Sequence, residues 1–216
     1  MAVTQAPEDA YTAAPFLPDR GDLTALREAA AGCRGCPLHR DATRTVFGAG
    51  AADARVMLVG EQPGDQEDRQ GKPFVGPAGK LLDRALAEAG IDPGEAYVTN
   101  AVKHFKFTRS GARGRRIHKA PGVREMKACG PWLAAELAAV EPELIVVLGA
   151  TAGKALLGSS FRVTQVRGRV LEEEIHGRPE RLVPTVHPSA VLRADDREAA
   201  YRGLVADLKI AAQALG

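Results

Sequence analysis

Four short apolar runs, rich in β-branched residues, constrain the fold of this chain more than any other feature of its sequence. These runs are almost continuously apolar. They lack the alternation of apolar and polar residues that is typical of a strand with one face in water. This pattern is typical of strands buried on both faces, as in a parallel sheet covered by helices. The runs are RVMLVG at 55–60, AYVTNAV at 96–102, ELIVVLG at 143–149 and RLVPTVH at 181–187.

Helical patterns separate these runs. Apolar residues recur at helical spacing in five segments: 22–32, 76–90, 122–140 (where we expect Pro131 to interrupt the helix), 150–158 and 196–215. Residues 161–174 alternate around Arg167-Gly168 and predict a hairpin. Strands that alternate with helices predict an α/β fold, a three-layer α/β/α sandwich with a central four-stranded, mostly parallel sheet. We expect one domain over 21–216 and a loosely ordered tail over 1–20.

The composition is that of an ordinary globular protein, with 45% hydrophobic and 26% charged residues among 216. No apolar run approaches the roughly 18 residues that a membrane-spanning helix needs. The first twenty residues lack the basic start and apolar core of a secretory signal. We therefore expect a cytoplasmic protein with no membrane partner.

Positive charge gathers in one part of the chain, although the net charge is only +2. Between Lys103 and Lys127 there are nine Lys or Arg residues against a single acid, Glu125. Such a segment favours a polyanion, most simply a nucleic-acid backbone. The alternative is a solvated surface loop without a partner.

Polar or glycine-rich segments follow all four predicted strands. They are EQPGDQ after the first, NAVKHFKF at the end of the second, GAT after the third and HPSA after the fourth. Ligands of open α/β sheets bind beyond the carboxyl ends of the strands. We therefore expect the functional site at this edge of the sheet.

The three cysteines indicate a metal centre. Cys33 and Cys36 form a C-x-x-C pair, which brings two sulfurs to one side of a turn, and Cys129 supplies a third thiol. His104, just past the second strand, is a candidate fourth ligand. Spacing alone leaves zinc and an iron–sulfur cluster both open. It also leaves open a redox pair beside a buried, inert Cys129.

Several ordered motifs resemble those of the uracil-DNA glycosylase superfamily, in its iron–sulfur-containing branch related to the family 4 enzymes. They are GEQPGDQEDRQGKPFVGPAGKLL at 60–82, VTNAVK at 98–103, HPSA at 187–190 and CRGCPLHR at 33–40. Three departures from that branch are Gln62 in place of Ala, His104 in place of a cluster cysteine, and the insertion RSGARGRRIHKAPG at 109–122. Together they resemble the UdgX class, whose members bind uracil-containing DNA very tightly.

The resemblance implies how uracil is bound. Asn100 would read the edge of the base with its amide, and Phe74 would stack on the flipped ring. His187 would hydrogen-bond uracil O2 as negative charge builds there during cleavage of the C1′–N1 bond. Gln62 would line the same site, near the position where a hydrolytic relative holds its water. The Asn100 pattern alone would more simply be a turn or cap residue.

The resemblance also implies an unusual second step. The imidazole of His118, in the RRIH segment, would attack the sugar C1′ in place of water and remain bonded to the DNA. Glu61 would stabilise the positively charged sugar and remove the proton of His118, directly or through Gln62. Asp65 would orient this network, or could be a solvated turn residue.

Contacts with the rest of the DNA and with a cofactor follow from the same resemblance. Arg116 would pair with a phosphate or hold the His118 loop in place, whereas Arg115, Lys119 and Ser189 would contact the DNA backbone. A [4Fe–4S] cluster with a structural role would be held by Cys33, Cys36, His104 and Cys129. The expected partner is uracil-containing DNA, preferably single-stranded, with free uracil as product and a monomeric protein.

Two other functions remain compatible with the sequence. The first is an ordinary hydrolytic uracil-DNA glycosylase with multiple turnovers, in which the basic loop merely grips phosphate. The second is a non-catalytic nucleic-acid-binding module stabilised by zinc.

Overall fold

The computed structural model describes residues 11–111 and 114–216 and contains a six-stranded sheet in the order β1-β3-β2-β6-β8-β7. The four predicted strands form its centre, where β3, β2, β6 and β8 are parallel. The edge strands β1 and β7 are antiparallel and extend the predicted four-stranded sheet on both sides. The strand bounds are β1 Ala49–Gly50, β2 Val56–Gly60, β3 Ala96–Asn100, β6 Leu144–Leu148, β7 Leu171–Ile175 and β8 Arg178–Thr185.

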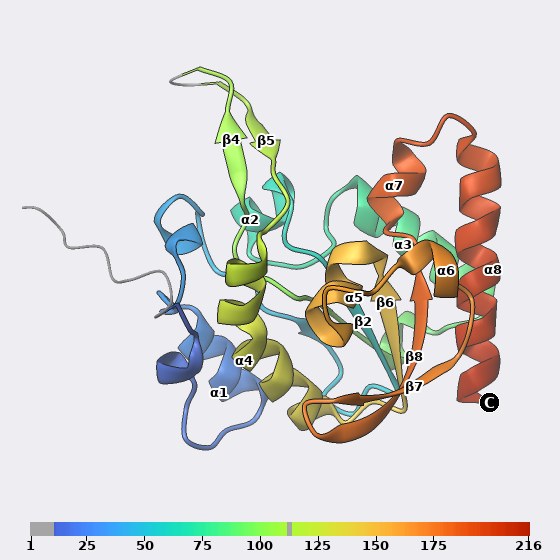
Figure 1. Cartoon of the computed structure of the whole chain (residues 1–216), viewed down its shortest axis with the longest axis horizontal. Helices are drawn as coiled ribbons and strands as arrows, with labels where there is room; N and C mark the ends of the chain where they lie inside the picture. The colour runs from blue at the N-terminus through green and yellow to red at the C-terminus, as the bar shows by residue number, and fades with distance from the viewer. Residues whose placement is uncertain (1–10, 112–113) are drawn as a thin grey trace, which may run out of the picture.

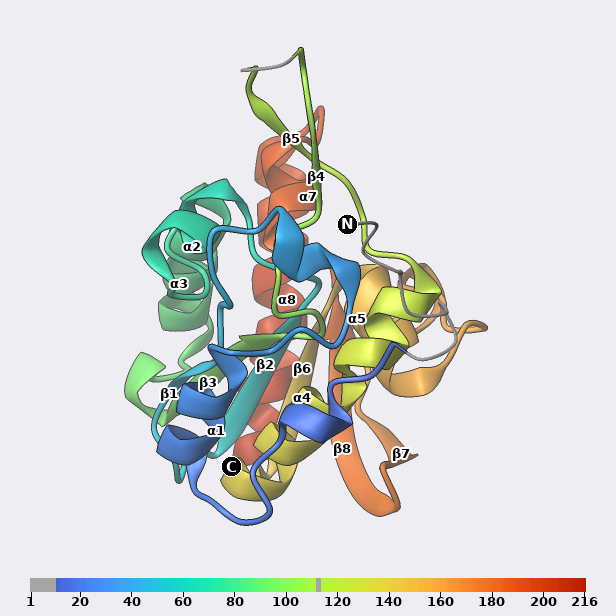
Figure 2. The same cartoon turned by 90° about the vertical axis from the view of Figure 1, so that its left-hand side faces the viewer.

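Helices cover both faces of this sheet and make a three-layer sandwich, as predicted (Figures 1 and 2). Alternate residues of one strand point into different layers, because successive side chains of a strand face opposite ways. In β2, Met57 and Val59 pack with the layer of α1, α4 and α5, whereas Val56 and Leu58 pack with that of α3 and α8. Each face of the sheet therefore has its own apolar core.

The helices lie close to their predicted positions. The longer ones are α1 Leu23–Ala30, α3 Pro77–Ala89, α4 Val123–Val140, α5 Gly149–Leu157 and α8 Arg197–Leu215. Short helices fill the connections: η2 Ala14–Phe16, η3 Pro37–Arg40, α2 Asp65–Gln70, η4 Pro93–Glu95, α6 Val163–Val166 and α7 Pro188–Leu192. None of the described helices is long and apolar enough to cross a membrane.

Two local predictions were wrong. Helix α4 runs through Pro131 without interruption, since Trp132, Leu133 and Leu137 are buried and hold the helix against the sheet. Residues 161–174 do not form a hairpin around Gly168, because α6 occupies their start. The hairpin instead joins β7 to β8 at His176-Gly177, where both residues have positive φ (53° and 78°), as a tight two-residue turn requires.

The predicted N-terminal tail, residues 1–20, is described only in part. Residues 1–10 of the predicted tail lie outside the described residues. Within 11–20 the chain packs on α4: Ala13 is buried, and its N–H donates to the carbonyl oxygen of Ala128 at 2.7 Å. This part of the predicted tail is therefore anchored rather than loose.

The basic segment is a β-hairpin and not an irregular loop. Strands β4 (Phe107–Arg109) and β5 (Arg116–His118) form a separate two-stranded antiparallel sheet, in which Phe107 lies opposite His118. This hairpin projects beyond the carboxyl ends of the central strands, on the side of the molecule where α7 also lies (Figures 1 and 2). The fold thus brings His118 to the edge of the sheet where a ligand is expected.

Candidate functional site

A cavity of about 670 Å³ opens at the carboxyl ends of the central strands. It collects seven of the predicted site residues from segments far apart in the sequence. Asp65, Arg115, Arg116 and Lys119 are not among the residues that line it. Its walls are formed by Glu61, Gln62, Gly64, Glu67, Phe74, Ala78, Asn100, Ile117, His118, Ala120, His187, Ser189 and Arg193.

Asn100 presents an unused hydrogen-bond acceptor to this cavity. It ends β3 and is 3% exposed, and its Oδ1 atom is buried without a partner among the described residues. Gly60 leaves the room for it: a Cβ there would lie 2.4 Å from Asn100 Oδ1 and 2.7 Å from the Phe74 ring. Since buried polar groups are normally hydrogen-bonded, the free oxygen suits an N–H of a bound ligand.

Phe74 and His187 form the aromatic part of the cavity. Their ring centres are 6.2 Å apart and the planes are inclined by 29°. Phe74 has a positive φ of 53°, and its carbonyl lies so close to Gly79 that a Cβ there would come within 1.6 Å of the oxygen. This strained backbone holds the ring at the cavity wall.

The protonation state of His187 is fixed by its neighbours. Its Nδ1 atom accepts the backbone N–H of Ser189 at 3.1 Å and lies 2.8 Å from the Ser189 hydroxyl. Burial lowers the pKa of His187 to about 4, so the ring is neutral near pH 7. The remaining proton therefore sits on Nε2, which can donate a hydrogen bond. Ser189 lines the cavity and orients this histidine; its contact with DNA stays a prediction.

His118 and Glu61 meet at the mouth of the cavity. Nε2 of His118 lies 3.0 Å from Oε1 of Glu61, and the two side chains are 51% and 20% exposed. Burial raises the pKa of Glu61, but hydrogen bonds from His118 and from Thr151 of α5 outweigh it, so the pKa lies below its usual value. Glu61 is thus an ionised acceptor for the imidazole proton. The sequence analysis did not identify Thr151.

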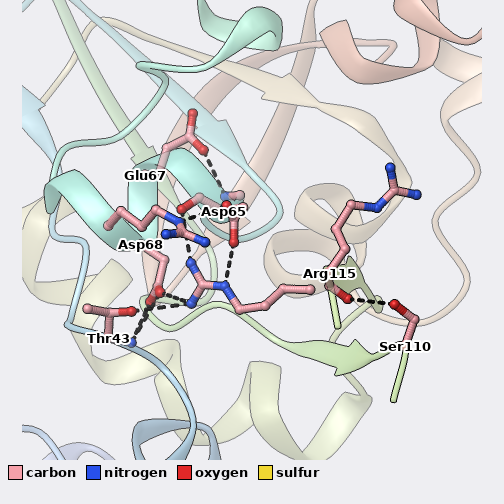
Figure 3. Close-up of polar contacts among 9 residues, drawn as sticks. Thr43, Asp65, Glu67, Asp68, Ser110 and Arg115 are labelled. Carbon is pink, nitrogen blue, oxygen red and sulfur yellow. Dashed lines mark hydrogen bonds and ion pairs between the residues drawn. The ribbon is translucent and has the colours of Figure 1, made fainter. Parts of the chain in front are cut away.

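Arg116 anchors the hairpin that carries His118, and Figure 3 shows the surrounding acids. Its guanidinium pairs with Asp65 and with the fully buried carboxylate of Asp68. It also donates to Thr43 Oγ1 at 3.2 Å. The rings of Phe105 and Phe107 lie 5.4 Å and 5.0 Å from the same group. Of the two roles expected for Arg116, holding the loop is therefore the one that its contacts favour.

Gln62 ties the two ends of the hairpin to β2. Its side-chain amide donates to the carbonyl oxygens of Lys106 (3.2 Å) and Lys119 (3.1 Å), and its oxygen accepts the Lys106 N–H at 3.1 Å. The amide is therefore occupied by the backbone of the hairpin. Gln62 lines the cavity as predicted, but its polar atoms hold the hairpin in place.

The positive charge of the basic segment is partly cancelled inside the protein. Lys103 is buried against Glu136, Lys106 pairs with Glu125, and Arg116 is paired as described. Arg115 and Lys119 are exposed, and Figure 3 shows the Arg115 side chain directed away from Asp65. Arg113 lies outside the described residues. The surface available to a polyanion is therefore less basic than the sequence predicts.

Glu67 belongs to the site although the sequence analysis passed over it. Its two carboxylate oxygens accept the backbone N–H groups of Gly64 (3.1 Å) and Gly76 (2.7 Å). It thereby joins the turn after β2 to the segment that carries Phe74. The signal in the sequence is its position three residues after the glycine that caps α2, a capping-box spacing.

The four predicted metal ligands are all buried in one region. Cys33 accepts the indole N–H of Trp132 at 3.2 Å, and Cys129 accepts the backbone N–H of Lys103 at 3.3 Å. Nε2 of His104 lies 3.0 Å from Thr45 Oγ1. In the described part of the chain, no three His, Cys, Asp or Glu side chains converge on a single metal ion.

Comparison with known proteins places these features in a family. Residues 47–209 match the profile of the family described as Uracil DNA glycosylase superfamily. A Type-4 uracil-DNA glycosylase of Thermotoga maritima is 38% identical over 77% of this chain and 81% of its own length. The Type-4 uracil-DNA glycosylases of Pyrobaculum aerophilum and Archaeoglobus fulgidus are 37% and 36% identical, over 80% and 74% of this chain and 85% and 78% of their own.

We predict that Arg116→Ala destabilises the folded protein. The substitution leaves the buried Asp68 without its cation and should lower the free energy of unfolding by about 3 kcal/mol, measured by urea denaturation. Arg115→Ala is the matched control, because this neighbouring arginine is exposed. Equal losses in the two variants would contradict an anchoring role.

The neutral state of His187 predicts a pH dependence. A histidine whose pKa falls from 6.5 to about 4 on folding binds fewer protons in the folded state. Its contribution to stability is therefore present above pH 6.5 and is lost as the pH falls towards 4. Urea denaturation at pH values across this window should show a steeper loss for the wild type than for His187→Gln. Parallel losses would contradict it.

Proposed function

This chain belongs to the uracil DNA glycosylase superfamily, and we propose that it excises uracil from DNA and then bonds to the deoxyribose C1′ through His118. Uracil-DNA glycosylase activity is supported by the family and by the Type-4 relatives. The covalent step goes beyond them. It is supported by the hydrogen bond that brings the imidazole of His118 to Glu61 at the mouth of the cavity.

One observation carries the assignment of uracil, namely the buried and unpartnered Oδ1 of Asn100. Uracil carries an N3–H flanked by two carbonyl oxygens, so this acceptor, with the amide NH₂ beside it, matches N3–H and O4. The Phe74 ring would stack on the base, and Nε2–H of His187 would donate to O2. Extruding the base into such a pocket costs a few kcal/mol, least from a single strand.

The excision step needs charge stabilisation at two places. When the C1′–N1 bond breaks, its electron pair leaves with N1, and negative charge spreads to O2, where His187 donates its proton in a hydrogen bond. The sugar is left positively charged at C1′. The carboxylate of Glu61, ionised because its pKa is lowered, stabilises that charge.

His118 would then form the new bond. A ring nitrogen donates its electron pair to C1′, and Glu61 accepts the ring proton, which finally neutralises the departing uracil anion. The products are a histidine–C1′ bond and free uracil, so atoms and charges balance. Because this bond has no easy leaving group, the protein would act once.

A hydrolytic enzyme with multiple turnovers is the second candidate, and it fits the same cavity. There Glu61 would activate a water, and the hairpin would serve to bind DNA. The contacts that favour covalent bonding are those that fix the hairpin, since Arg116 and Gln62 hold it from two sides. A segment that merely grips phosphate has no need of internal carboxylate partners.

The remaining proposals concern DNA and oligomeric state. Arg115 and Lys119 are exposed on the hairpin and would contact phosphates. Each contact with a single strand contributes about 0.7 to the slope of log affinity against log salt. We propose that single-stranded DNA is preferred and that the protein acts as a monomer.

We further propose that Cys33, Cys36, Cys129 and His104 hold a [4Fe–4S] cluster with a structural role. Their burial and the N–H groups that donate to two of the sulfurs suit cluster thiolates. A single zinc ion would require four donors to converge on one point. The resemblance of CRGCPLHR at 33–40 to the cluster-binding segment of the iron–sulfur-containing branch favours the cluster over zinc.

Replacing His118 tests the covalent step. Wild-type protein mixed with a uracil-containing single-stranded oligonucleotide should give a complex that survives denaturing electrophoresis, one per protein molecule. His118→Ala should give none, because its side chain has no nucleophile. Lys209→Ala should still form it, because this exposed lysine of α8 does not line the cavity. Release of more than one uracil per wild-type molecule, without such a complex, would establish the hydrolytic candidate instead.

Metal analysis tests the cluster. Purified protein should contain about four irons per chain and absorb broadly in the visible range. Cys129→Ala should lose most of this iron, while His104→Cys should retain it, because thiolate is the usual ligand of such clusters. One zinc per chain in colourless wild-type protein would contradict the proposal.

A further inference from the structure

A second cavity, of about 340 Å³, lies next to the first between α3, α7 and the start of α8. The short helix α7 separates the two. It contributes Ser189 to the first cavity, whereas Val191 and Leu192 line the second. Arg193, which ends α7, lines the first cavity as well. A DNA strand that leaves the first cavity across α7 would meet the second.

The lining of this second cavity combines cations with an apolar floor. Lys80, Arg84 and Arg197 face a single acid, Glu198, which itself contacts Arg202 at 3.4 Å. Leu81, Val191 and Leu192 supply the apolar surface. Three cations against one acid leave an excess of two positive charges beside a surface that can accept a base. This chemistry suits a nucleotide, which has a charged phosphate and a flat, weakly polar base.

Arg84 provides a flat platform at this place. Its guanidinium carbon lies 4.1 Å from the centre of the Tyr201 ring, in a cation–π contact. The hydroxyl of Tyr201 donates to Glu88 Oε2 at 3.0 Å, and this bond fixes the orientation of the ring. Arg84 is exposed and Tyr201 is buried. The outer face of the guanidinium is thus open to a base, and arginine planes stack well on nucleobases.

We propose that the second cavity binds the nucleotide adjacent to the uracil nucleotide, with its base stacked on Arg84 and its phosphate paired with Lys80 or Arg197. This proposal rests on the proposed function, because the uracil in the first cavity sets the position of the strand. It predicts that affinity depends on a neighbouring base of any type, since stacking does not distinguish sequences.

The test compares oligonucleotides that differ by one nucleotide beside the uracil. Two series extend the strand on the 5′ or the 3′ side, and a third replaces the neighbouring base with an abasic site. The rate of uracil release, followed with protein in excess, gives the half-saturating protein concentration for each. For wild-type protein, this concentration should fall at least about fivefold when the neighbouring base is present on one side.

Arg84→Ala should lose that gain and bind the strand with and without the neighbouring base alike. The losses from removing the base and from removing Arg84 should therefore not add, as expected for groups in contact. Lys80→Ala should keep the dependence on the base but lower the salt slope by about 0.7. Lys209→Ala is the matched control, since this exposed lysine of α8 does not line the cavity.

Two results would overturn the proposal. One is a wild-type protein that gains nothing from a neighbouring base on either side; the other is an equal effect of Arg84→Ala and Lys209→Ala. Failure of the proposed function gives a different result, namely no uracil release from any oligonucleotide. Fluorescence anisotropy with the same strands would then measure binding directly and would still distinguish Arg84→Ala from the control.

Discussion

The ion pair between Lys103 and Glu136 joins the sheet to α4 at the level of the functional site. Both side chains are fully buried, and Glu136 also accepts hydrogen bonds from Tyr97 and Thr99. Lys103 donates from Nζ to the carbonyl oxygen of Asn100 at 2.7 Å and from its backbone to the sulfur of Cys129. The Lys103–Glu136 pair therefore fixes the position of Asn100 at the end of β3. It also fixes how far Asn100 lies from Cys129. Loss of either side chain would leave a buried charge without its partner and would lower the free energy of unfolding strongly.

The sequence predicted the central layer well because that layer depends on local pattern. Strands buried on both faces leave continuous apolar runs, and these located β2, β3, β6 and β8 to within a few residues. The errors arose where long-range contacts decide the outcome. Burial of Trp132 and its neighbours keeps α4 continuous through Pro131. The position of the last hairpin depends on which turn can adopt positive φ.

The structure brings together the residues that the sequence analysis expected at the strand ends, but their contacts were not predicted from the sequence. The strand-end motifs correctly brought Glu61, Asn100 and His187 to one cavity. They could not reveal that Arg116 points inward, because its partners Asp65 and Asp68 precede it by about fifty residues. Thr151 was missed for the same reason: nothing in the local sequence of α5 indicates that its threonine will contact a distant carboxylate.

The hairpin of His118 begins and ends almost at the same point. The Lys119 N–H donates to the Lys106 carbonyl oxygen at 3.0 Å, and the amide of Gln62 bridges both residues. A segment whose ends already touch can be gained or lost without displacing the chain on either side. The hairpin is therefore a self-contained addition to the fold, because most of the residues that line the cavity come from other segments. Since the side chain of Gln62 binds both ends, a hairpin of this kind can be added to the fold by one insertion, without changes to the core.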